Sequence, residues 1–113
     1  MEFSIKIISA GSRGKATFAP DSQNAQADSV VSWNNTTNRK HQPWPTDANY
    51  VLVPAAQLPP TSPNYMSDVI APGESSSPGF VTPQKWAGTI YYGCKLHPKS
   101  KTERGMIVVT VNP

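Results

Sequence analysis

The stretch that decides the fold reads Gly88-Thr89-Ile90-Tyr91-Tyr92-Gly93-Cys94-Lys95-Leu96-His97-Pro98. Its first five residues are rich in β-branched and aromatic side chains, which favours a strand that leads directly to the cysteine. The cysteine and the histidine stand three positions apart, and a proline follows the histidine. This spacing places a thiol and an imidazole together on one loop at the end of a strand.

The chain of 113 residues contains one cysteine and two histidines. The other histidine, His41, comes directly after a polar segment that includes residues 34–38. A thiolate and two imidazoles form the trigonal donor set that suits copper cycling between its two oxidation states. We therefore predict that His41, Cys94 and His97 bind one copper ion, with His41 brought to the loop by the fold. Zinc suits the same donors.

Short apolar segments separated by glycine and proline predict strands along the rest of the chain. Residues 50–53 are predicted as a short strand or a helical turn, and no long helical period is present. This pattern predicts an all-β sandwich of about seven to eight strands. The predicted strands cover residues 3–8, 16–20, 29–34, 66–70, 79–81, 88–92 and 106–111.

The length of the chain fits one domain over residues 1–113. Within it, residues 42–65 are rich in proline, and we predict an ordered insertion that covers one edge of the sandwich.

Basic residues gather near the cysteine, although the formal net charge is only +3. They form either an ordinary solvated loop or a docking surface for an acidic partner. Nucleic acid is not expected as a partner, because no basic stripe is interleaved with aromatic residues. The basic residues are Lys95, Lys99, Lys101 and Arg104.

No apolar run approaches the length of a membrane span, and residues 1–20 lack the core of a signal peptide. Two explanations stay open at this point. Either Met1 is the start of a cytoplasmic protein, or the chain is a mature domain whose signal or anchor is not in this sequence.

Several segments occur in the order found in one known family. They are Phe18-Ala19-Pro20, Val30-Val31-Ser32-Trp33-Asn34-Asn35, His41, Ile70-Ala71-Pro72-Gly73-Glu74, Phe80, the loop of residues 88–98 and Gly105-Met106-Ile107-Val108-Val109. In these segments the chain resembles the cupredoxins, the small blue copper proteins that include plastocyanin, pseudoazurin and azurin. The likeness covers most of the chain apart from residues 42–65.

The resemblance implies a Greek-key β-sandwich with a mononuclear type 1 copper site at one end. It implies that His41, Cys94 and His97 are the equatorial ligands, and that the protein is an electron carrier and not an enzyme. Redox partner proteins would dock near His97, the partly exposed ligand. We further expect a monomer in a periplasmic or other extracytoplasmic location.

The axial ligand is where the sequence departs from the family. Met106 is the thioether nearest to the loop and is narrowly favoured, although it lies nine residues after His97. It is also out of phase with Ile107 and Val109 on a regular strand. Glu103 is in phase with them and would favour Cu(II) as a harder ligand. The third alternative is an open axial site.

Two other functions compete with electron transfer. One is a copper-binding or delivery module with an open axial site. The other is an enzyme with Cys94 as nucleophile and a histidine as base, although no motif supplies an Asn or Asp to orient that base. Trp44 follows His41 closely and is a candidate shield of that residue against water. The resemblance to the cupredoxins also implies that the backbone N–H of Gln42 donates to the ligating sulfur.

Overall fold

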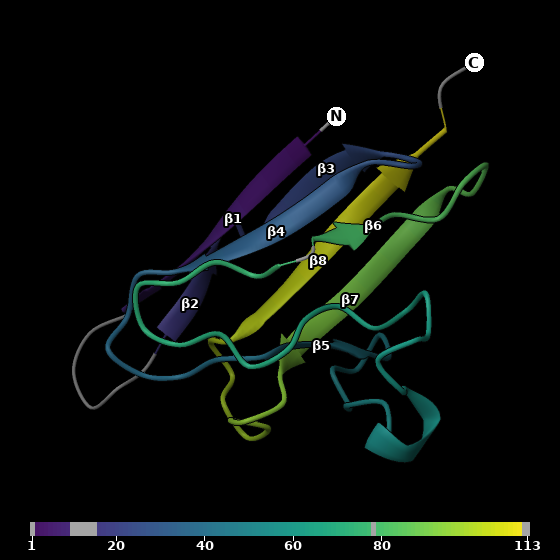
Figure 1. The fold of residues 1–113 in the computed structure, drawn as a ribbon. Coiled ribbons are helices and arrows are strands. Elements are labelled where there is room, and N and C mark those ends of the chain that lie inside the picture. The colour runs from purple at the N-terminus through teal and green to yellow at the C-terminus, as the bar shows by residue number, and fades with distance from the viewer. Residues whose placement is uncertain (1, 10–15, 78, 112–113) are drawn as a thin grey trace.

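In the computed structural model, which describes residues 2–9, 16–77 and 79–111, two four-stranded sheets pack face to face (Figure 1). The first sheet has the strand order β2-β1-β4-β6, and the second has the order β3-β8-β7-β5. The predicted all-β sandwich is confirmed. Its strands are β1 (Glu2–Ser9), β2 (Ala16–Ala19), β3 (Ser22–Gln26), β4 (Val30–Asn35), β5 (Pro43–Thr46), β6 (Phe80–Val81), β7 (Gly88–Cys94) and β8 (Arg104–Thr110).

The core lies between the sheets because apolar residues alternate along the strands. In β8, Gly105, Ile107 and Val109 are buried, whereas the residues between them are half-buried. In β4, Val31 and Trp33 are buried in the same alternating way. This two-residue period places one face of each strand in the core.

Tyr92 fills the centre of the core, directly opposite Gly105 on the neighbouring strand. Its ring packs edge-on against Phe18 and Trp33, with centroid distances of 4.8 and 5.3 Å. A Cβ atom on residue 105 would lie 2.5 Å from the tyrosine ring. Glycine is therefore needed at this position for β7 and β8 to pair while Tyr92 stays in the core.

The structure differs from the predicted strands at three places. Residues 66–70 do not form a strand, and in that segment Ile70 makes an isolated bridge to His41. The proline-rich segment 42–65 contains β5, which pairs with β7. The polar strand β3 was not predicted, because its sequence, Ser22-Gln23-Asn24-Ala25-Gln26, has little apolar character.

The remainder of the proline-rich segment has little regular structure. Within residues 50–53, Leu52 bridges to Thr46, and the short 3-10 helix η1 (Ala55–Gln57) follows. Among the described residues, no helix has the length and hydropathy needed to cross a membrane.

Candidate metal centre

Cys94 is the last residue of β7, and its side chain is 1 % exposed. The pairing of Pro43 with Cys94 brings the start of β5 beside it, so that the backbone N–H of Gln42 donates to Sγ at 3.4 Å. Burial raises the pKa of the Cys94 thiol to about 11, and the hydrogen bond from Gln42 offsets part of this effect. The thiol is thus protonated at neutral pH unless a cation replaces the proton.

His41 lies just before β5 and is fully buried. Its backbone makes two hydrogen bonds with Ile70. The N–H of His41 donates to the Ile70 carbonyl at 3.1 Å, and the carbonyl of His41 accepts from the Ile70 N–H at 2.7 Å. Its ring atom Nδ1 faces inward, 3.8 Å from Sγ of Cys94. Its other nitrogen, Nε2, lies 3.0 Å from the hydroxyl oxygen of Thr37.

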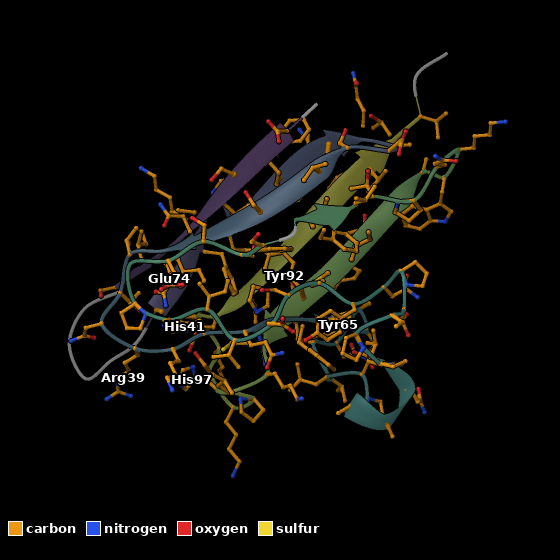
Figure 2. The ribbon with its side chains drawn as sticks, viewed as in Figure 1. Arg39, His41, Tyr65, Glu74, Tyr92 and His97 are labelled. Atoms are coloured by element: carbon orange, nitrogen blue, oxygen red, sulfur yellow. The ribbon has the colours of Figure 1, made fainter. Side chains whose placement is uncertain are left out.

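His97 lies on the loop between β7 and β8, and its side chain is 28 % exposed. The turn that carries it is closed by a hydrogen bond of 3.2 Å from its N–H to the carbonyl of Cys94. Its Nδ1 lies 3.3 Å from Sγ of Cys94, and its ring centroid lies 5.1 Å from that of His41. Figure 2 shows both histidines at the same end of the sandwich.

Glu103 completes the group from the position just before β8, and it is 3 % exposed. Its Oε1 lies 2.6 Å from Nδ1 of His41 and 3.2 Å from Nδ1 of His97. Burial alone would raise its pKa, but the hydrogen bond from His41 and the positive charge that either histidine carries when protonated hold the pKa of Glu103 below its ordinary value. The carboxylate is therefore an anion buried between two imidazoles.

Met106, which the sequence narrowly favours as the axial ligand, lies on the other face of β8. The burial pattern places Glu103 with the buried Gly105, Ile107 and Val109, and Met106 with the half-buried Arg104 and Val108. Since β8 starts at Arg104 without a bulge in its pairing to β7, the two-residue period runs through this region uninterrupted. Glu103, and not Met106, stands with the other donors.

The donor set fits one small cation. One donor atom from each of His41, Cys94, His97 and Glu103 lies within 4.8 Å of the others. Nδ1 of His41 lies 2.6 Å from Oε1 of Glu103 and 3.8 Å from Sγ of Cys94, so these atoms are close enough to bind the same ion. Thiolate, imidazole and carboxylate donors suit copper or zinc.

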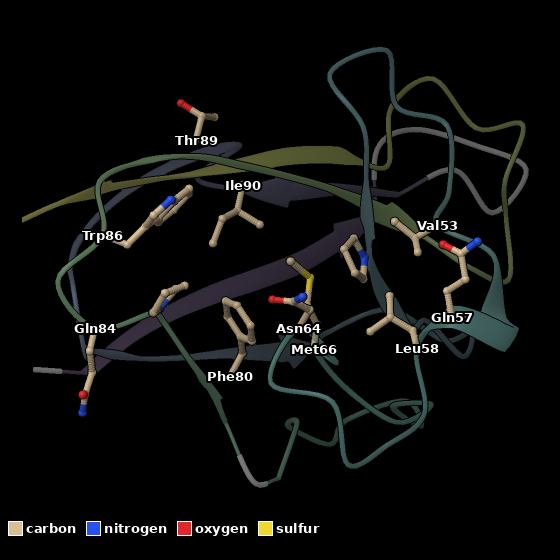
Figure 3. Close-up of a pocket in the computed structure, with 12 residues that line it drawn as sticks. Val53, Gln57, Leu58, Asn64, Met66, Phe80, Gln84, Trp86, Thr89 and Ile90 are labelled. Atoms are coloured by element: carbon tan, nitrogen blue, oxygen red, sulfur yellow. The ribbon is translucent and has the colours of Figure 1, made fainter.

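A large cavity, drawn in Figure 3, is lined by other residues than these donors. It has a volume of about 760 Å³, and its walls include Met66, Phe80, Trp86 and Ile90. None of the four donor residues lines it, so cavity size does not identify the functional site here.

Besides the predicted bond from the backbone N–H of Gln42 to the sulfur, two residues near the donors make contacts that the sequence did not predict. Trp44 packs against Tyr65, and its Nε1 donates to the Val53 carbonyl at 2.8 Å, so it anchors the proline-rich segment. The side chain of Gln42 donates to the Ser67 carbonyl at 3.0 Å and so braces the backbone that contacts the sulfur. The contact between Thr37 and His41 was not predicted, although the spacing of four residues in a polar loop is a usable signal.

The basic residues near the site divide into two kinds. Lys95 lies over the Trp44 ring at 4.4 Å, and Arg104 lies over the Tyr50 ring at 5.1 Å. Lys99 and Lys101 are exposed on the loop that carries His97. Free positive charge beside the partly exposed histidine therefore comes chiefly from these two lysines.

Comparison with known proteins identifies the fold. A purple cupredoxin from Nitrosopumilus maritimus is 21 % identical, with a TM-score of 0.67 over 95 % of this chain and 98 % of that chain. A reduced amicyanin variant is 17 % identical, with a TM-score of 0.63 over 96 % and 82 %. Oxidised plastocyanin from Dryopteris crassirhizoma is 22 % identical, with a TM-score of 0.57 over 95 % and 99 %. No family model and no curated protein matches the sequence. The chain has the fold of the cupredoxins, as the resemblance of its sequence predicts.

Proposed function

We propose that the protein is a small electron carrier that binds one copper ion through Nδ1 of His41, Sγ of Cys94, Nδ1 of His97 and Oε1 of Glu103. The observation that carries the proposal is that these four donors converge within 4.8 Å from elements of a packed sandwich. Copper bound there would supply one-electron exchange between Cu(I) and Cu(II).

The protein contributes a donor set whose positions change little with the charge of the ion. The backbone of His41 is bonded to Ile70, Cys94 ends a paired strand, and the carboxylate of Glu103 is buried. Side chains held by a close-packed scaffold move little, and small movement on gain or loss of an electron keeps the barrier to transfer low.

Glu103 distinguishes this proposal from a simple blue copper site. A buried carboxylate is a harder and more strongly charged donor than a thioether, so it stabilises Cu(II) relative to Cu(I). We therefore propose a lower reduction potential and an absorption spectrum shifted away from that of blue copper. Met106 has no part in this arrangement.

Two observations weigh against the competing functions. Burial and a raised pKa make Cys94 a poor nucleophile, which argues against a cysteine enzyme. The buried carboxylate of Glu103 stands among the other donors, where it would fill the position that a delivery module leaves open.

We further propose that electrons enter and leave through His97, because its side chain is the exposed member of the donor set. Lys99 and Lys101 lie exposed on the same loop, so the surface fits an acidic redox partner. An extracytoplasmic location, periplasmic in a bacterium, belongs to the same proposal.

The central test is Cys94→Ser in protein freed of zinc and loaded with copper. We expect intense visible absorption in the wild type and its loss in the variant, because the charge-transfer band needs the thiolate. Circular dichroism checks that the fold is kept. A wild-type protein that takes up copper without an intense band, or a variant with an unchanged band, would refute the proposed centre.

Glu103→Ala and Met106→Leu separate the two axial candidates. Because Glu103 stands among the donors, Glu103→Ala should raise the reduction potential by more than about 59 mV, which is a tenfold change in the preference for Cu(II) over Cu(I). Its spectrum should approach that of blue copper. Met106→Leu, the matched control, should leave the potential and spectrum nearly unchanged. Voltammetry measures the potentials and absorption spectroscopy the spectra. A large change in Met106→Leu with little change in Glu103→Ala would show that Met106 is the axial ligand.

His97→Gly and His41→Gly test which ligand is exposed. His97→Gly opens a gap at the surface, so added imidazole should restore the wild-type spectrum. His41 is fully buried beneath the loop, and His41→Gly should resist rescue at the same imidazole concentration. Absorption titrations compare the two, and equal rescue would contradict the assignment of His97 as the exposed ligand.

Reversal of charge at the loop tests the docking surface. Lys99→Glu together with Lys101→Glu should slow oxidation by the anion hexacyanoferrate(III) by about tenfold or more at low ionic strength. Lys85→Glu, an exposed lysine just before the far end of β7, is the control and should change the rate little. Stopped-flow kinetics give the rates. Equal effects of the loop variant and the control would show that electrons do not leave near His97.

A further inference from the structure

A chain of hydrogen bonds behind His41 runs from the backbone to the imidazole, and it involves two residues outside the donor set. Asn35 is the last residue of β4 and is fully buried. Thr37 follows in the polar loop and is also buried. Because the backbone of His41 is held by Ile70, this chain acts on the direction of the ring and not on the position of the main chain.

The orientation of the Asn35 amide is set by its surroundings. Its Nδ2 lies 2.7 Å from the carbonyl of Arg39 and 3.0 Å from the carbonyl of Ile70. Both carbonyls can only accept, so the NH₂ group must face them and Oδ1 must face Thr37. Oδ1 then accepts from the N–H of Thr37 at 3.0 Å and from its hydroxyl at 2.7 Å.

The hydroxyl of Thr37 therefore donates its proton to Oδ1 of Asn35. A threonine hydroxyl has one proton and two lone pairs. Its shortest contact is the one to Oδ1 of Asn35, and its next oxygen acceptor, the Arg39 carbonyl, lies at 3.1 Å. With the proton given to oxygen, the hydroxyl can only accept at its contact of 3.0 Å with Nε2 of His41.

We propose that Asn35 and Thr37 form a positioning pair that keeps a proton on Nε2 of His41 and leaves Nδ1 facing Cys94, His97 and Glu103. Thr37 is a positioning residue, since it touches the ligand and not the metal. The inference rests on the proposed copper site, and it adds the device that selects which nitrogen binds.

The pair matters because an imidazole offers two similar nitrogens. Without an acceptor behind the ring, a flipped His41 would keep its place in the sandwich while presenting a different atom to the other donors. Partners of this kind behind a metal-binding histidine fix its ring and raise its basicity, and their loss typically lowers metal affinity about 10- to 100-fold.

The first measurement needs no variant. Long-range ¹H–¹⁵N correlation spectra of the wild-type protein show which nitrogen of His41 carries hydrogen. We expect a proton on Nε2 both in the metal-free protein and with zinc bound. A His41 whose Nε2 carries no proton in the metal-free protein overturns the inference, whether or not the chain binds copper. Absence of metal binding with Nε2 protonated would instead refute the proposed function alone.

The second measurement compares three variants of the same loop. Thr37→Val removes the acceptor at nearly constant volume and should lower Cu(II) affinity about tenfold or more. Thr37→Ser keeps the hydroxyl and should retain most of the Cu(II) affinity of the wild-type protein. Thr36→Val is the matched control, because the Thr36 hydroxyl donates to the Ile7 carbonyl at 2.7 Å and does not face His41.

A purely structural role for Thr37 predicts a different result. Urea unfolding of the metal-free proteins then shows equal loss of stability in Thr37→Val and Thr36→Val, with equal Cu(II) affinities measured by competition with a chelator. That result, or a Thr37→Val protein in which Nε2 stays the protonated atom and the affinity is unchanged, overturns the proposal.

Discussion

The antiparallel pairing of β7 with β8 is the constraint on which the site depends. The register joins Tyr92 to Gly105 and Gly93 to Arg104, so the next residues along the two strands, Cys94 and Glu103, emerge side by side. Tyr92 can occupy the core only because residue 105 has no side chain. Packing in the middle of the sandwich thus sets the separation of a thiol and a carboxylate at its end.

That end of the molecule buries several polar groups, among them Thr37, His41 and Glu103. A carboxylate out of water is costly unless it is paired, and Glu103 is paired with two imidazoles. The thiol beside it stays protonated because of the same burial. Such a group of residues is stable in the metal-free fold and is already close to the arrangement that a cation would require, which reduces the rearrangement on binding.

The fold and the placement of Cys94 and His97 on one loop were predictable because their signals are local, whereas His41 was proposed from its residue type as the other histidine of the chain. The run into Cys94 has the character of a strand, and His97 follows on the same loop. The choice between Glu103 and Met106 as axial ligand was harder. A bulge in the long loop would shift which residues face the core, so the alternation along the strand did not decide between them. Here β8 begins at Arg104, early enough to keep Glu103 in phase. The strand at 43–46 was hidden by its prolines, and the proposed role of Asn35 and Thr37 depends on the carbonyls of Arg39 and Ile70.

The prolines of β5 have a consequence for how the molecules behave toward one another. The carbonyl of Pro45 accepts from Val53, so this residue faces away from β7, and Pro43 shares its phase. Neither residue has an N–H to offer on that outer side. At Pro45 this outer side already meets Val53 of the same chain, and at Pro43 a strand from a second molecule would find no N–H donor, which disfavours extension of the sheet. The segment that brings Gln42 to the sulfur therefore also hinders sheet growth beside the site, which protects the protein from aggregation through shared strands.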